Sequence, residues 1–129
     1  MKSWIQRGAF RADVDRRSDH LLVAEGNDRM SVDDMPAYLD EVDRLAAREG
    51  VEKAIFDARK NDGPFVVELR DERWSFFEHR TRLSRVAVIL PDELTVTRVN
   101  MTAIAKRIHQ RVRGFVDVPA AERWLGSGR

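Results

Sequence analysis

The run from Val86 to Leu90 constrains this chain most, because it places five apolar residues in succession. A strand with one face in water alternates apolar and polar side chains, whereas a short unbroken apolar run is typical of a strand covered on both faces. Segments with the apolar spacing of helices precede and follow this run. We therefore expect an α/β fold in which helices cover a sheet.

The other segments give the order of the expected elements. Residues 10–15 alternate apolar and charged side chains, and a polar turn separates them from the apolar residues 21–24, which together predict an N-terminal β-hairpin. Further strands are expected at residues 51–57, 85–90 and 114–117, and helices at residues 31–49, at residues 64–83, after residue 94 and from residue 119. Strands separated by helices imply right-handed crossovers. The predicted fold class is a single-domain α/β fold with a mixed, mostly parallel sheet, an N-terminal hairpin and crossover helices.

Local signals predict how two of these helices are built. Asp33 or Asp34 can cap the first amides of the helix over residues 31–49, and Gly50 supplies a common stop signal. In the helix after residue 94, we expect Met101, Ile104 and Ile108 to lie on one stripe that faces the core.

The composition limits the class of protein. The chain has 129 residues, a net charge of +1 and no cysteine. This length fits one domain over residues 1–129, with a frayed tail from about residue 126. The small net charge gives no overall field toward nucleic acid or membranes, and the lack of cysteine excludes disulfides and thiolate sites. No signal peptide and no apolar stretch near the ~20 residues of a membrane helix is present, so we expect a cytoplasmic protein.

The first candidate site is the loop after the strand that ends at Asp57. Open α/β sheets bind ligands at this edge, and the amides of a following helix attract anions. The loop residues that can hold a carboxylate or phosphate are Asp57, Arg59, Lys60, Asn61 and Gly63. A solvated turn built on Asn-Asp-Gly-Pro explains the same residues, and we favour that interpretation. No glycine motif of a nucleotide site is present.

The second candidate site is the segment at residues 91–97, which should lie at the same edge of the sheet. Asp92 and Glu93 are neighbouring carboxylates that can bind a cation together with Asp57, and Thr95 is a further candidate ligand-binding residue. Capping of the following helix explains Asp92 and Thr95 at least as well. We expect neither a metal ion nor a cofactor.

Two helical surfaces are candidate interfaces. Trp74, Phe76 and Phe77 have the spacing of core residues, but Phe76 and Phe77 point about 100° apart, so we expect one of them at the surface. That makes the helix over residues 64–83 the preferred element for a partner, a second copy or a lipid. A basic helix face, which a solvated surface also explains, is expected from Arg98, Lys106, Arg107, Arg111 and Arg113. No aromatic or RNA-binding motif accompanies these residues, which argues against nucleic acid.

Four segments carry a resemblance to a known family. They are Leu21-Leu-Val-Ala-Glu-Gly26, Ala54-Ile-Phe-Asp57, the strand at residues 85–90 and the C-terminal segment at residues 114–125. With the helices between them, these segments resemble the STAS superfamily, the sulfate-transporter and anti-sigma-factor-antagonist domains. The likeness covers roughly residues 4 to 125 and is strongest to small stand-alone bacterial SpoIIAA-like proteins.

The resemblance implies a regulatory or binding module. In anti-sigma-antagonist members a phosphorylated serine or threonine follows the aspartate that ends the middle strand, and the matching position here is Ala58. The hydroxyl that a phospho-switch requires is therefore missing. Many SpoIIAA-like members also lack it, and a likeness of that group to lipid-transfer domains has been proposed.

Two functional hypotheses follow. The first is a non-enzymatic, STAS-like regulatory or protein-interaction module with a protein partner or self-association. The alternative is a binding protein for a small apolar or anionic ligand such as a lipid. An enzyme is not expected, because the spacing assembles no nucleophile, base and orienting group, and the histidines His20, His79 and His109 are isolated from one another.

Overall fold

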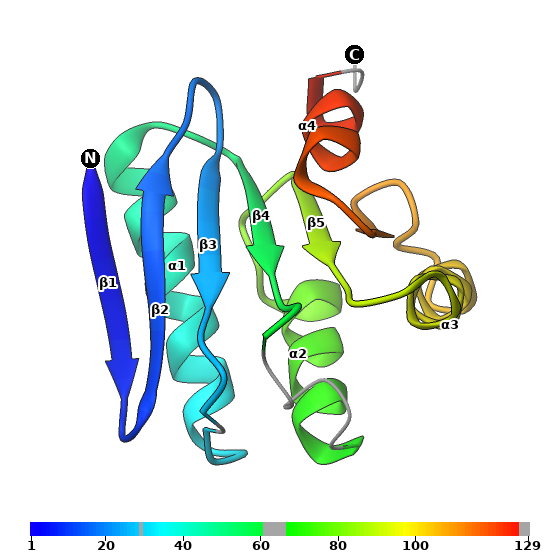
Figure 1. Ribbon diagram of the computed structural model, residues 1–129, viewed down its shortest axis with the longest axis horizontal. Helices are drawn as coiled ribbons and strands as arrows, with labels where there is room; N and C mark the ends of the chain where they lie inside the picture. The colour runs from blue at the N-terminus through cyan, green and yellow to red at the C-terminus, as the bar shows by residue number, and fades with distance from the viewer. Residues whose placement is uncertain (29, 61–66, 127–129) are drawn as a thin grey trace.

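The computed structural model describes residues 1–28, 30–60 and 67–126 (Figure 1). Within these residues the elements follow in the order β1 (Lys2–Arg7), β2 (Phe10–Arg16), β3 (Leu21–Glu25), α1 (Asp34–Glu49), β4 (Lys53–Asp57), α2 (Val67–His79), β5 (Arg85–Ile89), α3 (Glu93–Ala105), β6 (Val112–Phe115) and α4 (Val118–Gly126). The α/β class and the order of the predicted elements are confirmed.

The strands form one sheet in which spatial order equals chain order, from β1 to β6. The pairs β1–β2 and β2–β3 are antiparallel, and the three remaining pairs are parallel. The mixed, mostly parallel sheet with an N-terminal hairpin is thus confirmed, with one addition. Strand β1 was not predicted, because Ile5 is its only buried residue and one buried position gives no alternating pattern.

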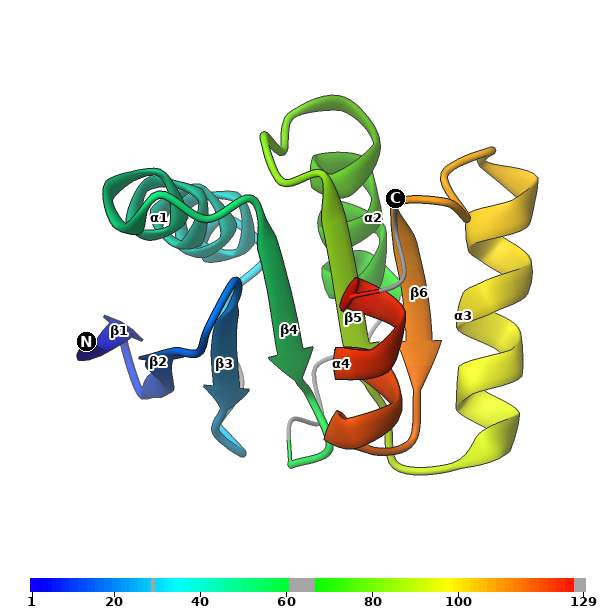
Figure 2. The same ribbon diagram turned by 90° about the horizontal axis from the view of Figure 1, so that it is seen from above.

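Helices cover the sheet unequally on its two faces (Figure 2). Because each parallel strand is added beside the previous one, right-handed crossovers place α1, α2 and α3 on the same face. Helix α4 lies on the opposite face, against β4, β5 and β6. Strand β5 is accordingly covered on both sides, with Val86 and Val88 in the core under α1 and α2, and Ala87 and Ile89 in the core under α4.

The ends of helix α1 are fixed by two different devices. Gly50 has the left-handed conformation, with φ of 70°, and its N–H donates to the Ala47 carbonyl at 3.2 Å, so the predicted stop is confirmed. The predicted aspartate cap is wrong, since the Asp33 side chain makes no capping hydrogen bond. Instead, the Ser31 hydroxyl oxygen accepts from the Asp34 N–H at 3.3 Å.

Helix α2 ends at His79, four residues before the predicted end. The chain after it is held by Asp43 of α1, which accepts from the Thr81 hydroxyl at 2.9 Å and from the Arg82 N–H at 2.8 Å. Burial of this carboxyl raises the pKa of Asp43, although these two hydrogen bonds oppose the shift. A tertiary contact therefore replaces the last predicted turn, and the residues before Val67 in the predicted helix lie outside the described residues.

The predicted inward stripe of the third helix is wrong for Met101 and Ile104, although Ile108 is buried in the core as predicted. Met101 and Ile104 are 64% and 59% exposed, while Val96 and Ala103 face the core. The helix stops at Ala105, and Arg107 adopts the left-handed region with φ of 60°. The Ile108 N–H then donates to the Ala103 carbonyl at 2.9 Å, which closes the helix in a Schellman motif and places Ile108 beyond it.

Candidate functional site

The carboxyl ends of the parallel strands lie level at one edge of the sheet. The register pairs Ala24 with Asp57, Asp57 with Ile89, and Ile89 with Phe115. The residues that follow these strands therefore meet at the edge where open α/β sheets bind ligands.

A buried polar cluster occupies this edge beneath α1 and α2. Glu25 is the last residue of β3 and has the same inward orientation as Leu21 and Val23. Arg73 of α2 donates to both of its carboxylate oxygens, at 2.9 and 2.8 Å, and the Tyr38 hydroxyl of α1 donates to it at 2.5 Å. Burial and the Glu25 charge raise the pKa of Tyr38 well above its usual value. The cluster ties two helices to one strand end.

Arg73 retains its charge in this buried position. Burial alone would lower the pKa of Arg73, but the adjacent Glu25 carboxylate outweighs that effect, and the pKa of Arg73 is raised. The guanidinium also lies 5.7 Å from the centre of the Phe56 ring, within the range of cation–π contact.

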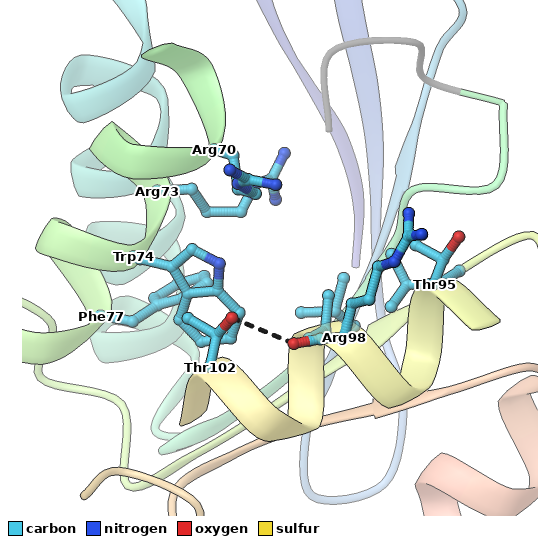
Figure 3. Close-up of a pocket in the computed structure, with 10 residues that line it drawn as sticks. Arg70, Arg73, Trp74, Phe77, Thr95, Arg98 and Thr102 are labelled. Carbon is cyan, nitrogen blue, oxygen red and sulfur yellow. Dashed lines mark hydrogen bonds between the residues drawn. The ribbon is translucent and has the colours of Figure 1, made fainter. Parts of the chain in front are cut away.

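A cavity of about 210 Å³ lies between α2 and α3, over the end of β5 (Figure 3). Its apolar lining comes from all three elements and consists of Trp74, Phe77, Val88, Leu90 and Val99. Its polar lining consists of Arg70, Arg73, Thr95, Arg98 and Thr102. Arg70 and Arg73 extend from α2 on one side, and Arg98 extends from α3 on the other. The cavity thus combines an apolar interior with three guanidinium groups.

The three arginines of this cavity differ in their charge balance. Arg73 is neutralised by Glu25, as described above. Arg70 and Arg98 are exposed, and neither forms an ion pair with any residue of the described ranges. Arg98 does act at longer range on Asp92, whose pKa is lowered first by hydrogen bonds from Thr95 and then weakly by this charge. With respect to the described residues, Arg70 and Arg98 therefore remain available to an anionic group.

The predicted ligand residues at positions 92 and 95 form the start of α3. Asp92 is the N-cap and accepts from the Thr95 N–H at 2.8 Å and from the Thr95 hydroxyl at 3.0 Å. The capping interpretation therefore describes the geometry of Asp92. Thr95 also lines the α2–α3 cavity, so one of the predicted ligand-binding residues lies at this cavity.

The predicted ligand residues of the first loop lie in a different hollow. Asp57, Arg59 and Lys60 line a space of about 310 Å³ beside β2 and β3, together with Arg11 and Glu25. Arg59 donates to Asp57 from Nε at 2.9 Å and from Nη2 at 2.6 Å. Burial alone would raise the pKa of Asp57, but the hydrogen bonds from Arg59 outweigh burial and hold that pKa below its usual value. The two groups thus satisfy each other, and Asn61 and Gly63 lie outside the described residues.

The predicted interface residues are buried. Trp74, Phe76 and Phe77 are 4%, 2% and 1% exposed, so the expectation that one phenylalanine remains at the surface is wrong. Arg80 covers Phe76 with its guanidinium 5.2 Å from the ring centre, and Phe77 packs on Phe56. Trp74 and Phe77 contribute instead to the wall of the α2–α3 cavity.

Sequence reasoning missed the site formed by Arg70, Arg73 and Glu25. The sequence contained a signal of this site. Arg73 shares the apolar stripe of its helix with Leu69 and Trp74, and Glu25 falls on the same face of its strand as the apolar, inward-facing residues. A charged residue on an inward face usually has a buried partner. Among residues 1–28, 30–60 and 67–126, no three histidine, aspartate or glutamate side chains are grouped so that they could hold a metal ion.

No protein-family model, curated protein or solved structure matches this chain. The STAS resemblance therefore stays a prediction. Across the described part of the chain, no helix has the length and apolar character needed to cross a membrane.

Proposed function

We propose that this protein binds a small amphipathic anion, such as a lipid or acyl compound with an acidic head group, in the cavity between α2 and α3. The observation that carries the proposal is the pairing of an apolar interior with the exposed guanidinium groups of Arg70 and Arg98. Apolar side chains supply most of the contact area of such sites, and a few charged groups set the orientation.

The size and polarity of the cavity favour a particular kind of ligand. Its volume of about 210 Å³ lies below the roughly 300–1,000 Å³ typical of drug-sized pockets, so the ligand is a single short chain or ring. The apolar portion would lie against Trp74, Phe77 and Val99, and the head group would lie between Arg70 and Arg98. Arginine suits this role because its planar donors match carboxylate and phosphate oxygens.

A titration with octyl phosphate tests the proposal. We expect saturable binding of octyl phosphate below its micelle-forming concentration, and no measurable binding of octanol or inorganic phosphate, by isothermal titration calorimetry. Arg98→Gln should weaken binding about tenfold, in line with the loss of one charged hydrogen bond. Arg123→Gln, on the opposite face of the sheet, is the matched control and should leave affinity unchanged. Equal affinity for octanol, or no effect of Arg98→Gln, would refute the proposal.

A STAS-like regulatory or protein-interaction role is the second candidate, and the sheet face opposite α1 favours it. Trp4 is 59% exposed there and stacks with Arg11 at 5.2 Å, over a hollow formed by the first three strands. An exposed aromatic side chain beside an unpaired edge strand is a common feature of interaction surfaces. Light scattering across protein concentrations, alone and with Trp4→Ser, tests this role. A monomer at every concentration, together with a pull-down that captures no partner protein, would count against this role.

In both proposals the protein has a non-enzymatic role in the cytoplasm, and neither role uses a phospho-switch. Ala58, at the position of the phosphorylated residue in the family that the sequence resembles, is 1% exposed, and its N–H donates to the Ile89 carbonyl at 3.0 Å. A methyl group buried in this way supports a role that does not depend on modification there.

A further inference from the structure

The outward surface of α3 is unusually apolar for a helix at the edge of the molecule. Leu94, Met101 and Ile104 are 62%, 64% and 59% exposed. The other large hydrophobic residues of the described ranges that are exposed, Met1, Trp4 and Val32, lie on other parts of the fold. Three such side chains on one short helix form a patch, which we call the α3 patch.

Helix geometry shows how this patch is oriented. Met101 is seven residues after Leu94 and Ile104 is three residues after Met101, so the three side chains lie on one side of the helix. Val96 and Ala103, on the opposite side, are buried against the sheet. In Figure 2 α3 lies at the β6 end of the helix layer, and none of the labelled elements lies beyond it. The side that carries the α3 patch therefore faces away from the protein.

The C-terminal half of the α3 patch has basic surroundings. No acidic residue occurs between Leu94 and Val116, whereas Arg98 lies on the helix, and Lys106 and Arg107 follow its end. These three cations are exposed; Lys106 lies 3.7 Å from Glu78, and the charge of Arg98 contributes to the lowered pKa of Asp92. Asp92 and Glu93 precede Leu94, so the rim of the patch is acidic at the start of α3 and basic from Arg98 onward.

We propose that α3 docks on the surface of a bilayer that contains anionic phospholipid. Amphipathic helices bind such interfaces through apolar side chains flanked by Lys and Arg. The apolar side chains insert among the acyl chains, and the anionic head groups attract Lys and Arg. The exposed cations Arg98, Lys106 and Arg107 favour a negative surface over a neutral one. A symmetric antiparallel pairing of two α3 helices would instead set Lys106 and Arg107 of one copy against Glu93 of the other, and the experiment below distinguishes that occupant.

The α3 patch also lies beside the α2–α3 cavity. Thr95, Arg98, Val99 and Thr102 line the cavity from the neighbouring side of the same helix, and Arg98 lies between that side and the patch. Docking at the usual ~5–10 Å depth would bring the cavity to the level of the head groups. This last step alone rests on the proposed function; the docking itself requires no cavity ligand.

Vesicle co-sedimentation of the full chain, without any added amphiphile, tests the proposal. We expect the partition coefficient on vesicles of equal parts phosphatidylcholine and phosphatidylglycerol to exceed that on pure phosphatidylcholine at least about tenfold, and to fall with added salt. The double variant Leu94→Gln/Met101→Gln should lose about tenfold of that binding. Because both side chains are exposed, circular dichroism should show an unchanged fold. Trp4→Gln, an equally exposed apolar residue elsewhere, is the matched control and should retain binding.

Other results would overturn the proposal. They are the absence of vesicle binding, equal binding to both vesicle types, or a double variant that binds like the parent chain. A dimer that the double variant dissociates would also overturn it and assign the patch to a second copy. Failure here leaves the octyl phosphate titration unaffected, because that titration contains no vesicles, and failure of that titration leaves docking unaffected.

Discussion

Arg73 of α2 donates two hydrogen bonds to Glu25 at the end of β3, and both side chains are buried. The chain separates the two residues by 48 positions, so the pair joins distant segments. The same arginine lines the α2–α3 cavity. The Glu25–Arg73 pair therefore sets the position of one cavity wall relative to the sheet.

Removing the cation of this pair should be strongly destabilising. We expect Arg73→Met to lower the free energy of unfolding by about 3–5 kcal/mol, because a buried carboxylate loses the guanidinium that compensates it. Urea denaturation at neutral pH measures the effect. Arg70→Met, the same substitution one turn earlier at an exposed site, should change stability by no more than about 0.5 kcal/mol.

The double variant Glu25→Gln/Arg73→Met separates lost charge compensation from lost packing. A neutral amide can still accept from the Tyr38 hydroxyl, so the double variant should recover at least half of the loss. If it is as unstable as Arg73→Met, packing of the arginine stem, and not its charge, supports the helix.

Tyr38 provides a spectroscopic measure of the same cluster. It is the only tyrosine of the chain, so phenolate absorbance in the near ultraviolet reports on it alone. Because burial and Glu25 raise the pKa of Tyr38, the folded protein should show no phenolate near pH 10, the usual value. The unfolded chain releases this proton there, so stability falls as the pH rises above about 10. A normal titration of the folded protein would contradict the buried cluster.

How far the sequence predicted this cluster depends on the element. The strand parity of Leu21, Val23 and Glu25 and the helical stripe of Leu69 and Arg73 are both readable, but neither tells which strand lies beneath which helix. The contact between Glu25 and Arg73 depends on tertiary packing, which a local pattern does not contain. The apolar run of β5, by contrast, needed no partner to be recognised.

The third helix shows why its inward stripe was predicted wrongly. The stripe of Met101, Ile104 and Ile108 assumes that the helix continues past position 105, but it ends there through Arg107 in the left-handed region. Glycine or asparagine usually signals such an end, and arginine does not. The exposure of Met101 and Ile104 was therefore not predicted.

Asp57 should make stability depend on acid. Since Arg59 holds the pKa of Asp57 below 3.8 in the folded protein, the stabilisation is present above that pH and is lost as the pH falls through the folded value. We expect Asp57→Asn to cost about 0.5–1 kcal/mol at pH 7, a small value because the Arg59 side chain is 45% exposed and solvent screens the ion pair. Urea denaturation at pH 7 and near pH 2 measures the difference. A difference that persists undiminished at acid pH would show that the ion pair is not its cause.

Arg107 and Gly50 occupy the same left-handed position after two helices, with φ of 60° and 70°. The left-handed conformation costs a residue other than glycine about 1–2 kcal/mol. Replacement by glycine removes this cost, but glycine loses more conformational entropy on folding, which offsets part of the gain. We therefore expect Arg107→Gly to raise the free energy of unfolding by about 0.5–1 kcal/mol. Gly50→Ala should lower it by about 1 kcal/mol, through backbone conformation alone, because an added Cβ meets no atom within 4 Å.

Arg107→Gly tests the end of α3 and Gly50→Ala tests the equivalent end of α1, and thermal and urea denaturation measures the effect of each substitution. Arg107 is exposed, so its replacement removes little packing that could mask the backbone effect. Arg107→Ala is the control that removes the same side chain and keeps the strained conformation, and it should not stabilise the protein. If Arg107→Gly is no more stable than Arg107→Ala, residue 107 does not hold the left-handed conformation in solution. The Schellman end of α3, which requires the left-handed conformation at Arg107, would then be absent in solution.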